Sequence, residues 1–97
     1  MTIASTREGI FCRIEVHGRF DFSCRADFRT AYTAASRGTK FIVDMTSVDY
    51  VDSAALGMLL LLRDHAGGAE NVVISGCKGQ PDQVLKIANF HKIFRFE

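Results

Sequence analysis

The sequence lacks a strong net charge and a long apolar run, and each absence excludes a class of protein. Its 97 residues carry a formal net charge of +1, which provides no field to steer a nucleic acid, so we expect no nucleic-acid partner. The longest apolar run, Ala54 to Leu62, is far shorter than the ~20 residues that span a bilayer. We therefore expect no direct insertion into a membrane.

The sequence also lacks an export signal and paired cysteines. The N-terminal stretch MTIASTREGIFCRI has no basic head followed by an apolar region, which predicts a cytoplasmic protein. The cysteines, Cys12, Cys24 and Cys77, are odd in number, widely spaced and in no CxxC pair. This pattern indicates reduced thiols that fill space, not a disulfide or zinc framework.

Catalytic motifs are missing as well. Ser53, in VDSAALG, lacks the glycine two residues before it that a GxSxG nucleophile elbow requires. His17, His65 and His91 stand far apart, without the HExxH spacing that holds a metal. No GxxxxGK[ST] or GxGxxG motif is present to cradle a phosphate. We therefore predict that the protein is not an enzyme and needs no cofactor or metal.

What is present is the composition of an ordinary soluble domain. Apolar residues make up 47% of the sequence and charged residues 24%. A chain of this length can bury roughly 60 to 70% of its unfolded surface, enough for one modest core. Without repeats or linkers, residues 1–97 are expected to form a single domain.

Hydrophobic periodicity predicts alternating strands and helices. Residues 10–16 alternate apolar and polar side chains, and residues 2–5 are expected to pair with them as a hairpin. Residues 24–36 show helical spacing, with Ser23 as the candidate N-cap and Gly38 as the stop. The remaining predicted elements are buried strands over 40–44 and 71–75, a turn over 46–50, helices over 53–66 and 82–88, and a closing strand over 92–96. This order predicts an α/β sheet with parallel neighbours and right-handed crossovers.

The helix expected over 53–66 has an unusual outer face. The side that can dock on a sheet consists of Ala55, Met58, Leu59, Leu62 and Ala66. The opposite side, where charge is expected, carries Ser53, Gly57, Leu60, Leu61 and Asp64. Either a partner covers this side, or neighbouring helices bury it. Ser53 itself is either an N-cap or a first-turn residue behind an Asp52 cap.

The stretch DMTSVDYVDSAALGMLLLL closely resembles the signature of the STAS domain family, the anti-sigma factor antagonists. The family's Gly-x-Leu/Phe-Asp loop is similar to GRFD, and its closing loop and strand are similar to ANFHKIFRF. Ala54 and Ala55 replace a hydroxyl and a glycine common in the family, and the matched residues end where many members add a helix. The positions that fall on the pattern are Gly18, Asp21, Asp44, Asp52, Ser53, Leu56 and Gly57.

The resemblance implies the STAS fold, a mixed, mostly parallel sheet of about four to five strands with about three helices mainly on one face. It also implies that an anti-sigma factor that is a serine-protein kinase phosphorylates Ser53, and that a PP2C-type phosphatase reverses this. The unphosphorylated form then captures the anti-sigma factor. We expect a monomer or weak dimer. Asp52 is expected to cap the helix and Asp44 to fix a turn. The expected partner-binding residues are Asp21, Asp52, Ser53, Gly57, Leu60, Leu61 and Asp64.

Another hypothesis keeps the fold and drops the switch. STAS-like domains also serve as non-phosphorylated accessory subunits of membrane lipid or anion transport systems, where the same helix docks unmodified. The length of the chain and the intact Asp52-Ser53 pair favour the switch. A small-molecule sensor would need a polar pocket that the sequence does not show.

Overall fold

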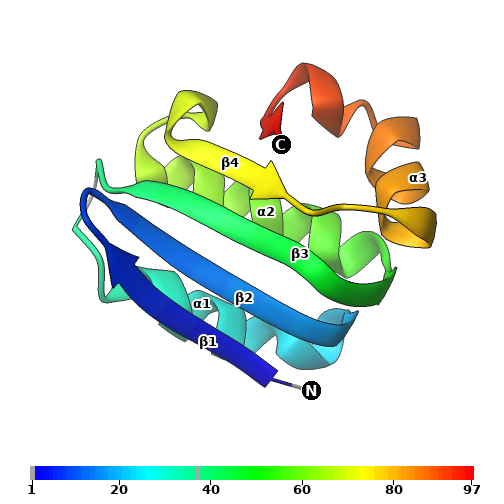
Figure 1. Ribbon diagram of the computed structural model, residues 1–97, viewed down its shortest axis with the longest axis horizontal. Coiled ribbons are helices and arrows are strands. Elements are labelled where there is room, and N and C mark those ends of the chain that lie inside the picture. Colours follow the sequence, from blue (N-terminus) through cyan, green and yellow to red (C-terminus); the bar gives the residue numbers. More distant parts are fainter. Residues whose placement is uncertain (1, 37) are drawn as a thin grey trace.

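A five-stranded sheet organises the protein, with strand order β1-β2-β3-β4-β5 (Figure 1). The computed structural model describes residues 2–36 and 38–97. Strand β1 is antiparallel to β2, and the other neighbours are parallel, which confirms the predicted mixed α/β sheet. The elements are β1 (Thr2–Glu8), β2 (Phe11–Phe20), α1 (Arg25–Thr33), β3 (Lys40–Val51), α2 (Ser53–Ala66), β4 (Val72–Ser75), α3 (Gly79–Ile87) and β5 (Arg95–Phe96), with 3-10 turns η1 (Phe22–Cys24), η2 (Ala69–Asn71) and η3 (Phe90–Lys92).

Helices α1 and α2 lie side by side behind the sheet, and α3 lies beyond the carboxyl end of β4 (Figure 1). No helix among residues 2–36 and 38–97 covers the front face of the sheet in this view. The strands expected over 40–44 and 71–75 were predicted to be buried on both faces, and this is wrong. Each alternates between buried and half-buried side chains: Ile42 and Val73 are only half-buried, whereas their neighbours Phe41, Val43, Val72 and Ile74 are buried. The core therefore lies between one sheet face and the helices.

Strand β3 is much longer than predicted. Residues 46–50, expected to form a turn, continue the strand, with Ser47 opposite His17 and Tyr50 opposite Arg19. The pairing shifts register on either side of Gly18, whose φ of 80° is a left-handed conformation. The segment resembles a turn in the sequence because Thr46, Ser47 and Asp49 are polar, and the structure leaves these side chains exposed along the strand.

Asp44 was expected to fix a turn, and this is wrong. It forms an ion pair within the sheet instead. Its carboxylate lies 3.0 Å from Nη1 of Arg13, whose Nε is 3.1 Å from Glu8. Burial acts to raise the pKa of Asp44, but hydrogen bonds from Thr46 and the charge of Arg13 outweigh it and hold the pKa below its ordinary value. This cluster stabilises the open sheet face.

Several boundaries also differ from the predictions. The helix predicted over 24–36 is η1 followed by α1, and its start is capped by Asp21, not Ser23. The predicted strand over 92–96 is shortened to β5 because Phe90 and Phe94 turn into the core, with ring centroids 5.5 Å apart. The helix predicted over 82–88 spans Gly79–Ile87.

The cysteines are free thiols, as the spacing indicated. Cys12 and Cys24 are buried, and burial raises the pKa of the half-buried Cys77 to about 11. No helix within residues 2–36 and 38–97 has the length and apolar character to cross a membrane.

Candidate functional site

Ser53 is the first residue of α2 and is separated from the end of β3 by Asp52 alone. Asp52 has an extended backbone, and its Oδ1 accepts a hydrogen bond of 3.1 Å from the backbone N–H of Ala55. Asp52 is therefore the N-cap, and Ser53 is the first-turn residue behind it. The side chain of Ser53 is exposed.

Asp52 also joins this helix to the preceding loop. Its second oxygen accepts a hydrogen bond of 3.3 Å from the backbone N–H of Phe22, in η1. Phe22 is 63% exposed, although its backbone is held at the site. One carboxylate thus fixes both the start of α2 and the position of η1.

Asp21 borders the same site. It caps η1 by accepting hydrogen bonds from the backbone N–H and the hydroxyl of Ser23, and Arg19 Nε lies 3.3 Å from its other oxygen. The hydrogen bond from the Ser23 hydroxyl, with help from Arg19, holds the pKa of Asp21 below its usual range. Asp21 and Asp52 therefore bond to the same short loop, and Asp21 is ionised at neutral pH.

The outward side of α2 is open to solvent over most of its length. Leu61 is 57% exposed, and an added Cβ at Gly57 would meet no atom within 4 Å. Leu60 differs from the prediction, because it is half-buried against the core. The buried side is the predicted one: Ala55, Met58, Leu59, Leu62 and Ala66. We call the exposed set the α2 face: Ser53, Gly57, Leu61 and Asp64.

Sequence reasoning named Asp21 of the loop as a site residue, but it missed Phe22 and helix α1 beside the α2 face. Arg25 lies over the Phe22 ring, 5.1 Å from its centroid, and Arg19 lies over the Tyr50 ring at 4.0 Å. These contacts join residues of different elements, so no local pattern in the sequence indicated them. The available signal was the phenylalanine at position 22, directly after Asp21 in the loop.

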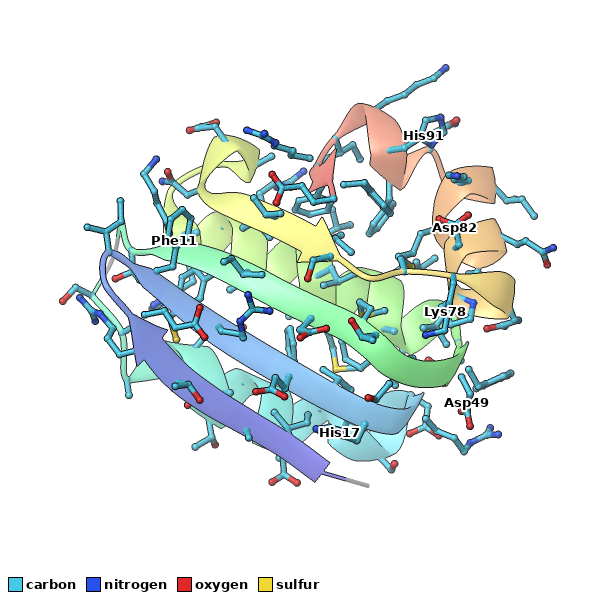
Figure 2. All side chains as sticks on the ribbon, in the orientation of Figure 1. Phe11, His17, Asp49, Lys78, Asp82 and His91 are labelled. Carbon is cyan, nitrogen blue, oxygen red and sulfur yellow. The ribbon has the colours of Figure 1, made fainter. Side chains whose placement is uncertain are left out.

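The histidines do not assemble into a site. Figure 2 shows His17 on β2 and His91 beside α3, at opposite sides of the molecule, and His65 belongs to α2. Within the described part of the chain, no group of three or more His, Cys, Asp or Glu side chains could hold a metal ion. The chemistry that the site offers is an accessible hydroxyl at a helix N-terminus, beside an exposed apolar face.

Comparison with known proteins gives a family match over nearly the whole chain. The family model described as "Mlab, STAS domain" matches residues 3–95. A STAS-domain containing protein of Pseudomonas aeruginosa (strain UCBPP-PA14) is 44% identical over 98 residues, covering 98% of this chain and 96% of the relative.

Solved structures share the fold at low sequence identity. A putative anti-sigma factor antagonist from Thermotoga maritima has a TM-score of 0.81 at 13% identity, covering 97% of this chain and 84% of that one. The anti-sigma factor antagonist SpoIIAA in its unphosphorylated form has a TM-score of 0.68 at 15% identity, covering 99% and 87%. A sulfate transporter family protein from Wolinella succinogenes has a TM-score of 0.72 at 18% identity, covering 90% and 73%.

Proposed function

The chain belongs to the STAS domain family, and on this premise we propose that it is an anti-sigma factor antagonist whose binding is switched by phosphorylation of Ser53. In its unphosphorylated state it sequesters an anti-sigma factor that is also a serine kinase. The observation that carries the proposal is the exposed hydroxyl of Ser53 at the start of α2, next to the exposed Gly57 and Leu61.

The domain itself should tolerate a phosphate on Ser53. The first turn of α2 leaves backbone N–H groups without helical partners, and Asp52 satisfies that of Ala55. A phosphate at this helix end meets the positive end of the dipole, which is favourable by roughly 0.3 to 1 kcal/mol. The switch therefore works without unfolding the helix.

The phosphate destabilises the complex with a docked partner by more than it stabilises the start of α2. The phosphate adds about −1.5 to −2 charges directly after Asp52. The phosphate would join Asp52 and the neighbouring Asp21, whose carboxylate pairs with Arg19 over 3.3 Å. Like charges enclosed by an interface cost several kcal/mol, and a loss of about 3 kcal/mol weakens binding more than a hundredfold.

The phosphoryl transfer itself belongs to the partners. The anti-sigma kinase supplies nucleotide and magnesium, and a PP2C-type phosphatase removes the phosphate. This protein supplies the acceptor hydroxyl and the surface around it. We place the switch in the cytoplasm, where such a kinase and its ATP are found.

Phosphorylation can be tested with protein expressed in its native cell. Incubation of the purified protein with native lysate and ATP should add a single phosphate, which mass spectrometry of peptides places on Ser53. Ser53→Ala should remain unmodified, whereas Ser5→Ala, at an exposed serine on β1, should be modified like the wild type. Phosphorylation of Ser53→Ala to the same extent as the wild type would contradict the proposal.

An accessory subunit of a membrane transport system is the second candidate. The fold similarity to the sulfate transporter family protein favours it. In that case α2 docks unmodified, and the lysate experiment adds no phosphate to Ser53. Ser53→Asp would then still co-purify with the components of a membrane transport system.

A further inference from the structure

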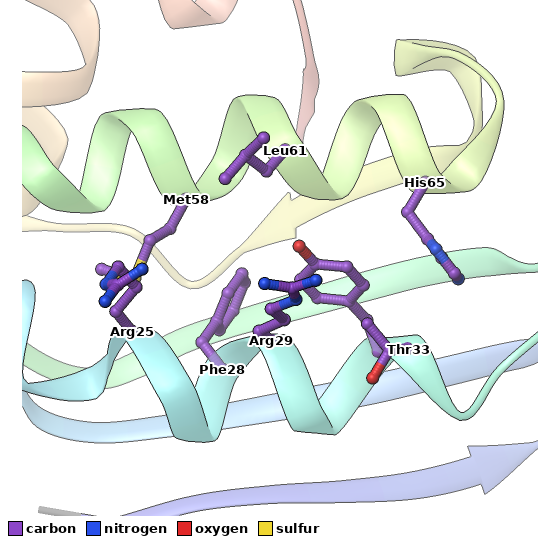
Figure 3. Close-up of a pocket in the computed structure, with 8 residues that line it drawn as sticks. Arg25, Phe28, Arg29, Thr33, Met58, Leu61 and His65 are labelled. Atoms are coloured by element: carbon purple, nitrogen blue, oxygen red, sulfur yellow. The ribbon is translucent and has the colours of Figure 1, made fainter.

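An amphipathic groove runs between α1 and α2, beside the α2 face. Its volume is about 300 Å³. Figure 3 shows Phe28 and Arg29 of α1 and Met58 of α2 directed toward the space between the helices. The groove combines an apolar lining with basic groups: the buried Phe28, Tyr32 and Met58 form its floor, the exposed Leu61 lies at its α2 side, and Arg25 and Arg29 supply the charge.

The basic groups of the groove have a regular spacing. Arg25 and Arg29 are four residues apart on α1, so their positions differ by about 6 Å along the helix axis. Within the described chain, neither arginine takes part in an ion pair, and Arg25 only stacks on Phe22. Both are exposed. Carboxylates one turn apart on a second helix would match this spacing.

The two ends of the groove differ. At one end, His65 donates from Nε2 to the backbone carbonyl of Ala35 over 3.0 Å, which ties α2 to the segment after α1. At the other end, Arg25 contacts Phe22, whose backbone is bonded to Asp52 beside Ser53. The groove is therefore continuous with the phosphorylation site through a chain of direct contacts.

We propose that this groove binds an acidic amphipathic helix of the protein partner, with apolar side chains against the exposed Leu61 and carboxylates against Arg25 and Arg29. From Arg25 to Thr33 the groove extends about 12 Å, or two helical turns, which accommodates apolar side chains at i and i+4. Both arginines belong to α1, whereas α2 carries the exposed carboxylate of Asp64, so the acidic side of the partner helix faces α1. This inference rests on the proposed function, because it names the part of the partner that the antagonist captures.

The first test uses a defined probe. A synthetic helical peptide with Leu at i, i+4 and i+7 and Glu on the adjacent flank is titrated into the labelled protein and followed by NMR. Amide shifts are expected at residues 25–33 and 58–65. An analogue with Lys in place of every Glu should bind at least tenfold more weakly. Equal binding of both peptides, or shifts confined to another surface, would overturn the proposal.

The second test reverses the charge of the groove. Arg25→Glu with Arg29→Glu should weaken binding of the acidic peptide about tenfold or more and should improve binding of the Lys analogue. Lys40→Glu with Lys92→Glu makes the same change in net charge at exposed positions outside the groove, and should leave both affinities within about threefold. If both double variants lose affinity for the acidic peptide equally, the net charge of the protein alone explains the binding, and the groove is not the binding site.

These tests separate the groove from the switch. The peptide experiments do not depend on phosphorylation, so they decide the groove even if Ser53 is never modified. Conversely, a phosphate that Ser53 acquires in lysate supports the switch even if the peptide fails to bind. Only the groove proposal is overturned by a peptide that causes no shifts at residues 25–33 and 58–65.

Discussion

Asp52→Ala should destabilise the domain measurably, because the Asp52 carboxylate accepts two hydrogen bonds: one caps α2 and the other holds the η1 turn against it. Loss of the N-cap bond to Ala55 costs about 1 kcal/mol. Loss of the exposed bond from the Phe22 N–H adds about 0.5 kcal/mol, since water replaces the acceptor in part. For a domain of this size, about 1.5 kcal/mol lowers the melting temperature by roughly 6 to 12 °C. Thermal melting followed by circular dichroism, with urea unfolding, measures this change.

Asp64→Ala is the matched control on the same helix. Asp64 is exposed near the C-terminal end of α2, with only a 3.4 Å pair to Arg63, so its removal should change the free energy of unfolding by less than about 0.5 kcal/mol. If Asp52→Ala melted within about 2 °C of both the wild type and this control, the cap assigned to Asp52 would be wrong.

Three further substitutions test the sheet and the α2 face. In the folded protein, burial acts to raise the pKa of Asp44, but Thr46 and Arg13 outweigh it and lower this pKa. The ionised Asp44 therefore stabilises the fold above about pH 4, and this contribution is lost as the pH falls through the folded pKa. Urea unfolding between pH 5 and pH 2 should show that Asp44→Asn loses less stability over this range than the wild type does. Gly57→Ala should raise the free energy of unfolding by about 1 kcal/mol, because alanine favours the helix and an added Cβ at this position meets no atom within 4 Å. The same methyl group should weaken partner binding, measured by calorimetry, because it keeps the partner backbone away from α2. Leu61→Asp should leave the melting temperature within about 3 °C but weaken the partner complex at least tenfold, and unchanged affinity would exclude Leu61 from the interface.

The order of the elements could be predicted because the signals for it are local. The start and end of α2 follow from a capping aspartate and the glycines after Ala66, and the structure places both where the sequence indicated. The identity of the buried side of α2 followed equally from helical spacing. In each case the information lies within one turn or one strand of the chain.

The failures have a common physical cause, which is that burial depends on distant segments. Residues 46–50 look like a turn because most of their side chains are polar and exposed, although the strand continues there by pairing with β2, which periodicity alone cannot reveal. A helical wheel places Leu60 and Leu61 together, yet packing half-buries Leu60 and leaves Leu61 57% exposed. The groove depends on α1 lying against α2, so no pattern within either helix predicts it.

The most direct test of the switch compares two forms of the same protein, one carrying phosphoserine at position 53 and one unmodified. Isothermal titration calorimetry with the partner kinase co-purified from the native cell should give a Kd at least a hundredfold higher for the phosphorylated form, while circular dichroism shows the same fold for both. Equal Kd values for the two forms would contradict the claim that a charge at Ser53 controls the docking surface.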